Sequence, residues 1–171
     1  VWTSSWTDRI IGHASSRDLI HWSEQQAIPV MMHEPTAHNC WAPELFYDEP
    51  SQTYYIFWAT TIPGRHKEIP TSESEKGLNH RIYYATTKDF RTFSKTKMFF
   101  NPDFSVIDAA IVKDPKLGDL IMIVKNENSN PPEKNLRVTR TKKVEKGFPT
   151  KVSAPITGKY WAEGPAPLFV G

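Results

Sequence analysis

Apolar and aromatic residues in this chain gather in short runs separated by polar turn sequences, and almost no run shows helical periodicity. Thr53–Ala59 is a run of aromatic and β-branched residues, and Asp119–Lys125 is a largely aliphatic run. Short runs of this kind, bounded by Pro, Gly, Asp and Asn, are typical of β-strands. The pattern therefore predicts an all-β chain with many turns.

The expected strands are spread along the whole chain and fall into groups. In chain order these are Val1–Ser5 with Arg9–Ser16; Asn39–Asp48, Thr53–Ala59 and the hairpin His80–Ser94; Phe104–Asp114, Asp119–Lys125, Asn135–Thr141 and Lys151–Pro155; and Tyr160–Phe169. The loops Trp6–Asp8, Thr61–Asn79 and Asn126–Lys134 are each expected to join a second strand to a third.

One hairpin sequence occurs twice, at a constant offset of 71 residues and without a gap. The matched pairs are Ala14 with Ala85, Arg17 with Lys88, Asp18 with Asp89, Leu19 with Phe90, Trp22 with Phe93 and Ser23 with Ser94. In each copy a Ser or Thr pair ends a strand, and the following Asp side chain can bond the backbone of a turn. Both Asp residues are therefore expected to form turns, and the repeat indicates an array of supersecondary units.

A β-propeller explains the repeat, if a blade of about 40 to 50 residues carries one long loop. The expected blades are 1–38, the end of one blade; 39–103, a second blade; 104–159, a third; and 160–171, the inner strand of a fourth. The chain would then be part of a single propeller domain, covering about two full blades and a partial blade at each end.

Prolines and carboxylates support this arrangement. Proline is tolerated only at strand edges or starts, and the first strand of every propeller blade is an edge that faces the central channel. Three prolines fall in expected first strands: Pro43, Pro165 and Pro167. One carboxylate also falls in the first strand of each blade: Glu44, Asp108 and Glu163.

Composition excludes several classes of function. The net charge of +2, without a basic run interleaved with aromatics, argues against a nucleic-acid partner. No apolar stretch is long enough to span a membrane. The one cysteine, Cys40, rules out an internal disulfide, and the six histidines lack the spacing of metal ligands.

The ordered set of motifs resembles glycoside hydrolase family 43. The resemblance rests on Trp41-Ala-Pro-Glu44, Val106-Ile-Asp-Ala109, Glu163-Gly-Pro165 and the Ser16–Trp22 hairpin, and it runs through essentially the whole chain. It implies a five-bladed β-propeller enzyme that cleaves arabinosyl or xylosyl linkages in plant-type glycans by an inverting mechanism. Its partners would be an oligo- or polysaccharide and the remaining blades of the same propeller.

Catalytic roles also follow from the resemblance. Glu163 matches the general acid, and Asp108 matches the residue that orients the acid and raises its proton affinity. The general base of the family is an Asp on the inner strand of the first blade, which is expected upstream of Val1. The 171 residues by themselves are therefore expected to be inactive. No cofactor is required, and the ligands of a structural cation in the channel would come mostly from other blades.

Other side chains near these strands are candidate sugar contacts. Trp41 and Trp161 open inner strands and are candidates to stack on a sugar ring, with packing between blades as the competing interpretation. Glu44 fits a structural role or a place on the substrate rim equally well. The complete predicted set is Trp41, Trp161, His38, Glu44, Trp6 and Lys125. The loops Trp6–Asp8, Thr61–Asn79 and Asn126–Lys134, with Lys125 and Glu127 at a loop base, are expected to shape the substrate pocket.

Two other interpretations fit the same pattern. A propeller that binds carbohydrate without cleaving it would have the same strands, and a related hydrolase acting on fructans is a close rival. A protein-interaction propeller would explain the repeat but not the carboxylates. A secreted or periplasmic protein is expected, with any signal sequence lying before Val1.

Overall fold

The computed structural model describes residues 1–69, 78–128 and 131–168. Its regular structure in these ranges is almost entirely β, with one short 3₁₀-helix, η1 (Val144–Lys146). The strands are β1 (Trp2–Thr3), β2 (Ile11–His13), β3 (Gln26–Ile28), β4 (Trp41–Asp48), β5 (Thr53–Thr60), β6 (Arg81–Thr87), β7 (Lys97–Phe100), β8 (Val106–Lys113), β9 (Leu120–Asn126) and β10 (Asn135–Thr141). No helix in the described ranges is long or apolar enough to cross a membrane.

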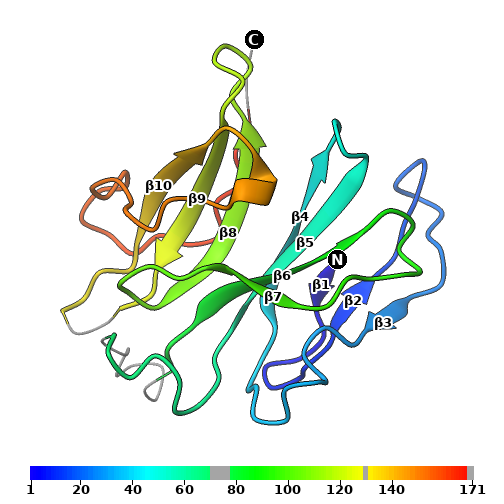
Figure 1. Ribbon diagram of the computed structural model, residues 1–171, viewed down its shortest axis with the longest axis horizontal. Coiled ribbons are helices and arrows are strands. Elements are labelled where there is room, and N and C mark those ends of the chain that lie inside the picture. Colours follow the sequence, from blue (N-terminus) through cyan, green and yellow to red (C-terminus); the bar gives the residue numbers. More distant parts are fainter. Residues whose placement is uncertain (70–77, 129–130, 169–171) are drawn as a thin grey trace.

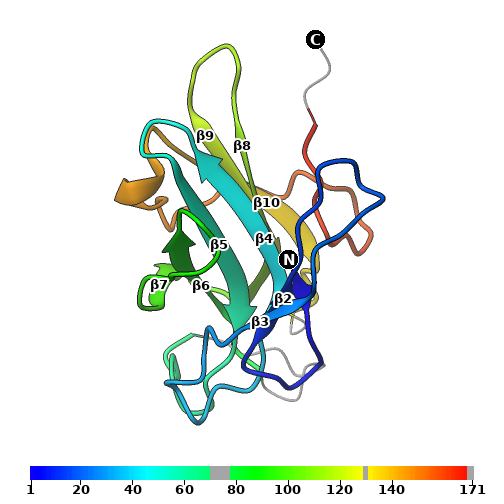
Figure 2. The ribbon, with the colours of Figure 1, turned by 90° about the vertical axis from the view of Figure 1, so that its right-hand side faces the viewer.

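The strands form three separate antiparallel sheets that follow one another along the chain (Figure 1). Their orders are β1-β2-β3, β4-β5-β6-β7 and β8-β9-β10. Strand β4, the first of the middle sheet, contacts both β1 and β8, so the three sheets meet along one side (Figure 2). The all-β prediction is confirmed, and the sequential antiparallel sheets are consistent with a propeller-like fold.

Two expected strands are absent from the described residues. Lys151–Pro155 was predicted as the fourth strand of the third group, but the chain only touches β10 there, through Ser153 N to Val138 O at 2.8 Å and Ile156 N to Leu136 O at 2.9 Å. Pro155 lacks the N–H that a continuous ladder would need at its position.

The segment from Tyr160 to Leu168 is also irregular, although a strand was predicted there. It contains Pro165 and Pro167, neither of which can donate a backbone hydrogen bond. It contacts the third sheet and the loop before β10 through hydrogen bonds that include Ala162 N to Lys134 O at 2.9 Å, Gly164 N to Asp108 Oδ2 at 3.0 Å and Lys125 Nζ to Glu163 Oε2 at 2.7 Å. Phe169, the last residue of the predicted strand, lies outside the described residues.

The repeated hairpin has the same structure in both copies. Asp18 Oδ1 accepts hydrogen bonds from the N–H groups of Ile20 and His21, and Asp89 Oδ1 accepts them from Arg91 and Thr92. The residue after each Asp is left-handed, with φ of 63° at Leu19 and 54° at Phe90. These bonds hold the pKa of both carboxyl groups below its usual range, with His21 as the largest contributor at Asp18. Both Asp residues form turns, as predicted.

Two hydrophobic cores join the sheets. The larger lies between the second and third sheets and includes Phe57, Ile82, Val106 and Met122, all fully buried. The smaller lies between the first and second sheets and includes Ile11, Met31, Ile56 and Trp58. Strand β5 supplies both, because Ile56 and Trp58 point to one face and Phe57 to the other. Because both faces of β5 are buried, apolar and aromatic residues follow one another without polar alternation in Thr53–Ala59.

Buried polar side chains tie the start of β6 to the start of β8. Arg81 Nη1 donates to Asn79 Oδ1 at 2.7 Å and to Phe104 O at 3.3 Å. The backbone of His80 accepts from Val106 N at 3.2 Å and donates to Ser105 Oγ at 3.1 Å. These bonds fix the position of β8, and so of Asp108, relative to the middle sheet.

Candidate active site

An open pocket of about 1040 Å³ lies where the first strands of the middle and third sheets meet the chain after β1 and the C-terminal segment. It is lined by Thr3, Ser4, Ser5, Trp6, Trp41, Ala42, Ile107, Asp108, Lys125, Glu127, Lys134, Trp161, Ala162, Glu163 and Gly164. Six predicted site residues are among them: Glu163, Asp108, Trp41, Trp161, Trp6 and Lys125. The structure thus brings together side chains that are far apart in the sequence.

Two equivalent β-bulges and one left-handed glycine lie on this pocket. The ladder of β4 shifts register between Trp41 and Glu44, and that of β8 shifts between Ile107 and Ala110. Inside each bulge one residue is left-handed, with φ of 45° at Ala42 and 52° at Asp108; Gly164 has φ of 58°. Bulges and left-handed non-glycine residues are strained features that cluster at functional sites.

These bulges show that Glu44 and Asp108 occupy different positions in their strands. Registered on the bulges, Asp108 of β8 corresponds to Ala42 of β4, and Glu44 corresponds to Ala110. Glu44 therefore lies two residues beyond the pocket position; it is exposed and its Oε1 accepts from Leu45 N.

Asp108 is largely buried at the inner end of the pocket. Burial raises its pKa, and the negative charges of Glu163 and Glu127 act in the same direction. A hydrogen bond from Gly164 N to Asp108 Oδ2, at 3.0 Å, and the charge of Lys125 oppose this rise. The same bond holds the Glu-Gly-Pro segment against β8.

Glu163 has the opposite environment. Its side chain is 73% exposed, and its Oε2 accepts a hydrogen bond from Lys125 Nζ at 2.7 Å. This bond and the charge of Lys125 lower the pKa of Glu163. The arrangement favours an ionised Glu163 beside Asp108, whose carboxyl group is harder to ionise. The roles inferred from the family resemblance require the opposite: a protonated Glu163 and an ionised Asp108.

Tryptophans form the walls of the pocket. Trp41 Nε1 donates to Trp6 O at 2.8 Å, and the two rings meet edge to face with centroids 5.6 Å apart. Trp161 is exposed, and Lys134 Nζ lies 6.0 Å from the centre of its ring. Flat aromatic surfaces beside carboxyl groups suit the apolar faces and hydroxyl groups of a sugar ring.

Two parts of the prediction lie away from the pocket. His38 is exposed and is not a lining residue, although its backbone N donates to Thr61 O. The described part of the Thr61–Asn79 loop also lines no part of the pocket. Lys134 and Ala42 are lining residues that sequence reasoning did not single out, because neither residue type nor spacing distinguishes them.

The described ranges contain no group of three or more His, Cys, Asp and Glu side chains arranged to hold a metal ion.

An all-β scaffold that gathers three carboxyl groups and three tryptophans on one open pocket has the features of a carbohydrate-active protein. Residues 3–166 match the model of the glycosyl hydrolase family 43-related domain, described as "Probable glycosyl hydrolase domain". The chain therefore belongs to this family, and the resemblance inferred from its motifs is confirmed.

A curated relative agrees with this assignment. The chain is 24% identical over 104 residues to an α-L-arabinofuranosidase of Bifidobacterium longum subsp. longum, a match covering 57% of this chain and 10% of that protein. The chain thus spans about a tenth of the length of this relative. Together, the family and the relative support a glycoside hydrolase.

Proposed function

We propose that this chain supplies part of the active site of a glycoside hydrolase that cleaves arabinosyl or xylosyl linkages in plant-type glycans with inversion. One observation carries the proposal: Asp108 and Glu163, from separate segments, meet on the pocket that also contains Trp6, Trp41 and Trp161. An open pocket gives a polymeric glycan access to these side chains. Because such glycans lie outside the cell, we also propose that the protein is secreted or periplasmic.

In the proposed reaction, Glu163 gives its proton to the glycosidic oxygen as the bond from that oxygen to the anomeric carbon breaks. A water molecule attacks the anomeric carbon from the opposite face and passes its proton to a carboxylate about 6.5–9.5 Å from the acid. That base is proposed to lie outside the present residues. Glu163 must become protonated for this role, and its contact with Lys125 must therefore loosen when a substrate fills the pocket.

The stereochemistry of the product tests the proposal. The full-length protein is incubated with an α-L-arabinofuranosyl or β-D-xylosyl oligosaccharide, and the anomer released first is identified by proton NMR before mutarotation. Inversion gives the anomer opposite to that of the substrate. Release of the same anomer would exclude the inverting mechanism, and no cleavage of any tested arabinosyl or xylosyl substrate would contradict the proposed activity.

A non-catalytic carbohydrate-binding protein is the second candidate function. It is favoured by the Lys125–Glu163 ion pair, because a carboxylate held in its ionised form cannot donate a proton. Isothermal titration calorimetry with the same oligosaccharides distinguishes the two functions. Binding without any turnover, by the full-length protein across the pH range, would favour this second candidate.

Asp108→Asn provides a separate prediction for the hydrolase. If ionised Asp108 raises the proton affinity of Glu163, removing its charge lets Glu163 lose its proton at lower pH. We expect lower turnover and an alkaline limb of the pH profile that moves to lower pH. The profile is measured on an oligosaccharide substrate, with Asp103→Asn, an exposed position outside the pocket, as the control. Wild-type turnover with an unchanged profile would leave Asp108 a purely structural role.

A further inference from the structure

A buried charge cluster lies beneath the candidate active site. It consists of Lys125, Glu127 and Lys134, and we call it the lysine–glutamate cluster. Glu127 Oε2 lies 2.7 Å from Lys125 Nζ, and Lys134 Nζ donates to Glu127 Oε1. The three side chains are only 6%, 3% and 5% exposed, in the same order. Buried charges destabilise a fold unless they are paired. One buried carboxylate that is shared by two ammonium groups is therefore unusual and calls for a functional explanation.

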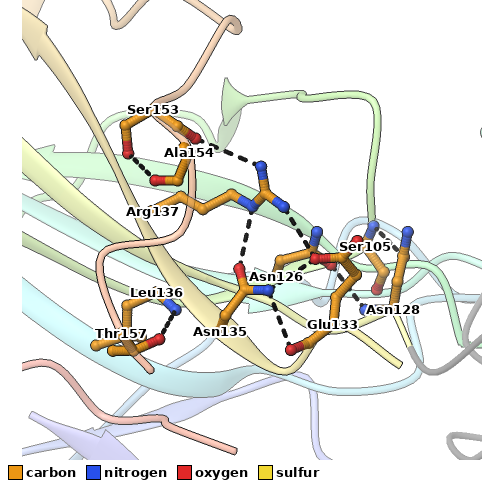
Figure 3. Close-up of polar contacts among 10 residues, drawn as sticks. All are labelled: Ser105, Asn126, Asn128, Glu133, Asn135, Leu136, Arg137, Ser153, Ala154 and Thr157. Atoms are coloured by element: carbon orange, nitrogen blue, oxygen red, sulfur yellow. Dashed lines mark hydrogen bonds and ion pairs between the residues drawn. The ribbon is translucent and has the colours of Figure 1, made fainter. Parts of the chain in front are cut away.

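The loop that carries the cluster is held by its own polar contacts (Figure 3). Ser105 N donates to Asn128 Oδ1 at 3.1 Å, and Ser105 O accepts from Glu127 N at 2.7 Å. On the other side of the loop, Glu133 Oε2 accepts from Arg137 Nη2 at 2.9 Å and from Asn135 Nδ2 at 2.7 Å. Both ends of the loop are therefore fixed, and with them the backbone positions of Glu127 and Lys134.

Lys125 is the link between this cluster and the pocket. Its ammonium group carries three N–H donors and lies 2.7 Å from both Glu127 Oε2 and Glu163 Oε2. Glu127 is buried and fixed, whereas Glu163 is mostly exposed and lies on an irregular segment. The contact with Glu127 thus determines where the ammonium group lies, and the ammonium group determines where the Glu163 carboxylate binds.

We propose that Glu127 is a positioning residue: by binding both Lys125 and Lys134, it holds the Lys125 ammonium group against Glu163. This inference rests on the proposed function, in which Glu163 is the general acid. It adds that Lys125 keeps Glu163 docked at the pocket wall in the free enzyme, whereas the carboxylate of Glu127, by sharing that ammonium group, limits how far Lys125 lowers the proton affinity of Glu163. The expected consequence is that the cluster controls both the orientation and the proton affinity of Glu163.

The charged groups around Glu163 decide the sign of each effect. Lys125 and Lys134 lower the pKa of Glu163, and burial opposes them. The carboxylate of Glu127 is paired with both ammonium groups, so its negative charge offsets part of their positive potential. His80 lies behind Lys125 and Lys134; burial lowers its pKa to about 3, so it stays neutral at the pH of the experiment. Removing Lys125 should therefore raise the proton affinity of Glu163, and removing the charge of Glu127 should lower it.

The pH dependence of kcat/KM, which reports the free enzyme, tests this in the full-length protein. Three variants are compared on one arabinosyl or xylosyl oligosaccharide: Lys125→Met, Glu127→Gln and the control Glu133→Gln, which lies on the same loop outside the pocket. We expect the alkaline limb to move to higher pH in Lys125→Met and to lower pH in Glu127→Gln. Glu133→Gln should leave it in place.

Shifts of opposite sign cannot arise from general loosening of the loop, which would move both variants alike. Shifts in the same direction, or none, would overturn the inference. If Glu127→Gln does not fold, Glu127→Asp replaces it: the retained charge should keep the limb near the wild-type position while kcat falls. The inference fails alone if Glu163→Gln behaves as a lost general acid while these profiles do not shift. It fails together with the proposed function if Glu163→Gln leaves activity unchanged.

Discussion

We expect Glu163→Gln to lower the turnover of natural glycans by the full-length protein about 10²–10⁴-fold, the usual contribution of a positioned general acid. Glutamine keeps the size of the side chain and can still accept a hydrogen bond from Lys125, but it has no proton to give. The loss should be large only where the leaving oxygen is strongly basic, as in a sugar alkoxide. The alkaline limb of the pH profile should also disappear, since it reports ionisation of Glu163.

Aryl glycosides with acidic leaving groups supply the matched control for this variant. Their phenolate departs without protonation, so Glu163→Gln should slow them far less than it slows the natural glycan. Equal losses on both substrates would place Glu163 on the water side of the reaction or in substrate binding. Unchanged turnover on both would make it a structural residue.

We expect Phe57→Ala to reduce the free energy of unfolding by about 3–5 kcal/mol, the range for removing a fully buried aromatic side chain. Phe57 is fully buried in the core between the second and third sheets, and its ring stacks on Phe99 with centroids 5.7 Å apart. Alanine would leave a cavity at the contact that holds β8 against β5. Hydrogen exchange of the β5 amides in the full-length protein measures this local stability.

Leu117→Ala is the control for the core substitution. Leu117 is a large hydrophobic side chain in the turn between β8 and β9, but it is mostly exposed. Surface substitutions of this kind usually change stability by no more than about 0.5 kcal/mol. If Phe57→Ala changed protection of β5 as little as Leu117→Ala, the assignment of Phe57 to the core between the sheets would be wrong.

The two predictions are connected through the geometry of the pocket. Asp108 lies on β8 and Trp41 on β4, and the larger core lies behind both strands. A loosened core should let these strands move apart, and the Glu163 segment, which the Gly164–Asp108 hydrogen bond holds to β8, would then move away from Trp41. Phe57→Ala should therefore also impair activity at temperatures below its unfolding transition.

Local sequence determined much of the fold. The aromatic run Thr53–Ala59 forms β5 because continuous apolar side chains suit a strand that is buried on both faces. The Asp18 and Asp89 turns formed as expected because a carboxylate side chain bonds backbone N–H groups within its own few residues. Interactions of this kind need no partner from elsewhere in the chain, so a pattern in the sequence is enough to predict them.

Long-range packing decided the rest. The bulges that place Asp108 in the pocket and Glu44 outside it depend on how β8 and β4 pair with their neighbours, and no single-strand pattern records an extra residue. The pairing of Lys125 with Glu163 depends on a loop and a C-terminal segment that meet only after folding. The sequence by itself therefore determined the all-β character, the repeat and the family motifs, which are local. Only the tertiary structure decided which carboxyl group is buried and which is paired with a lysine, because burial and charge proximity depend on residues distant in the chain.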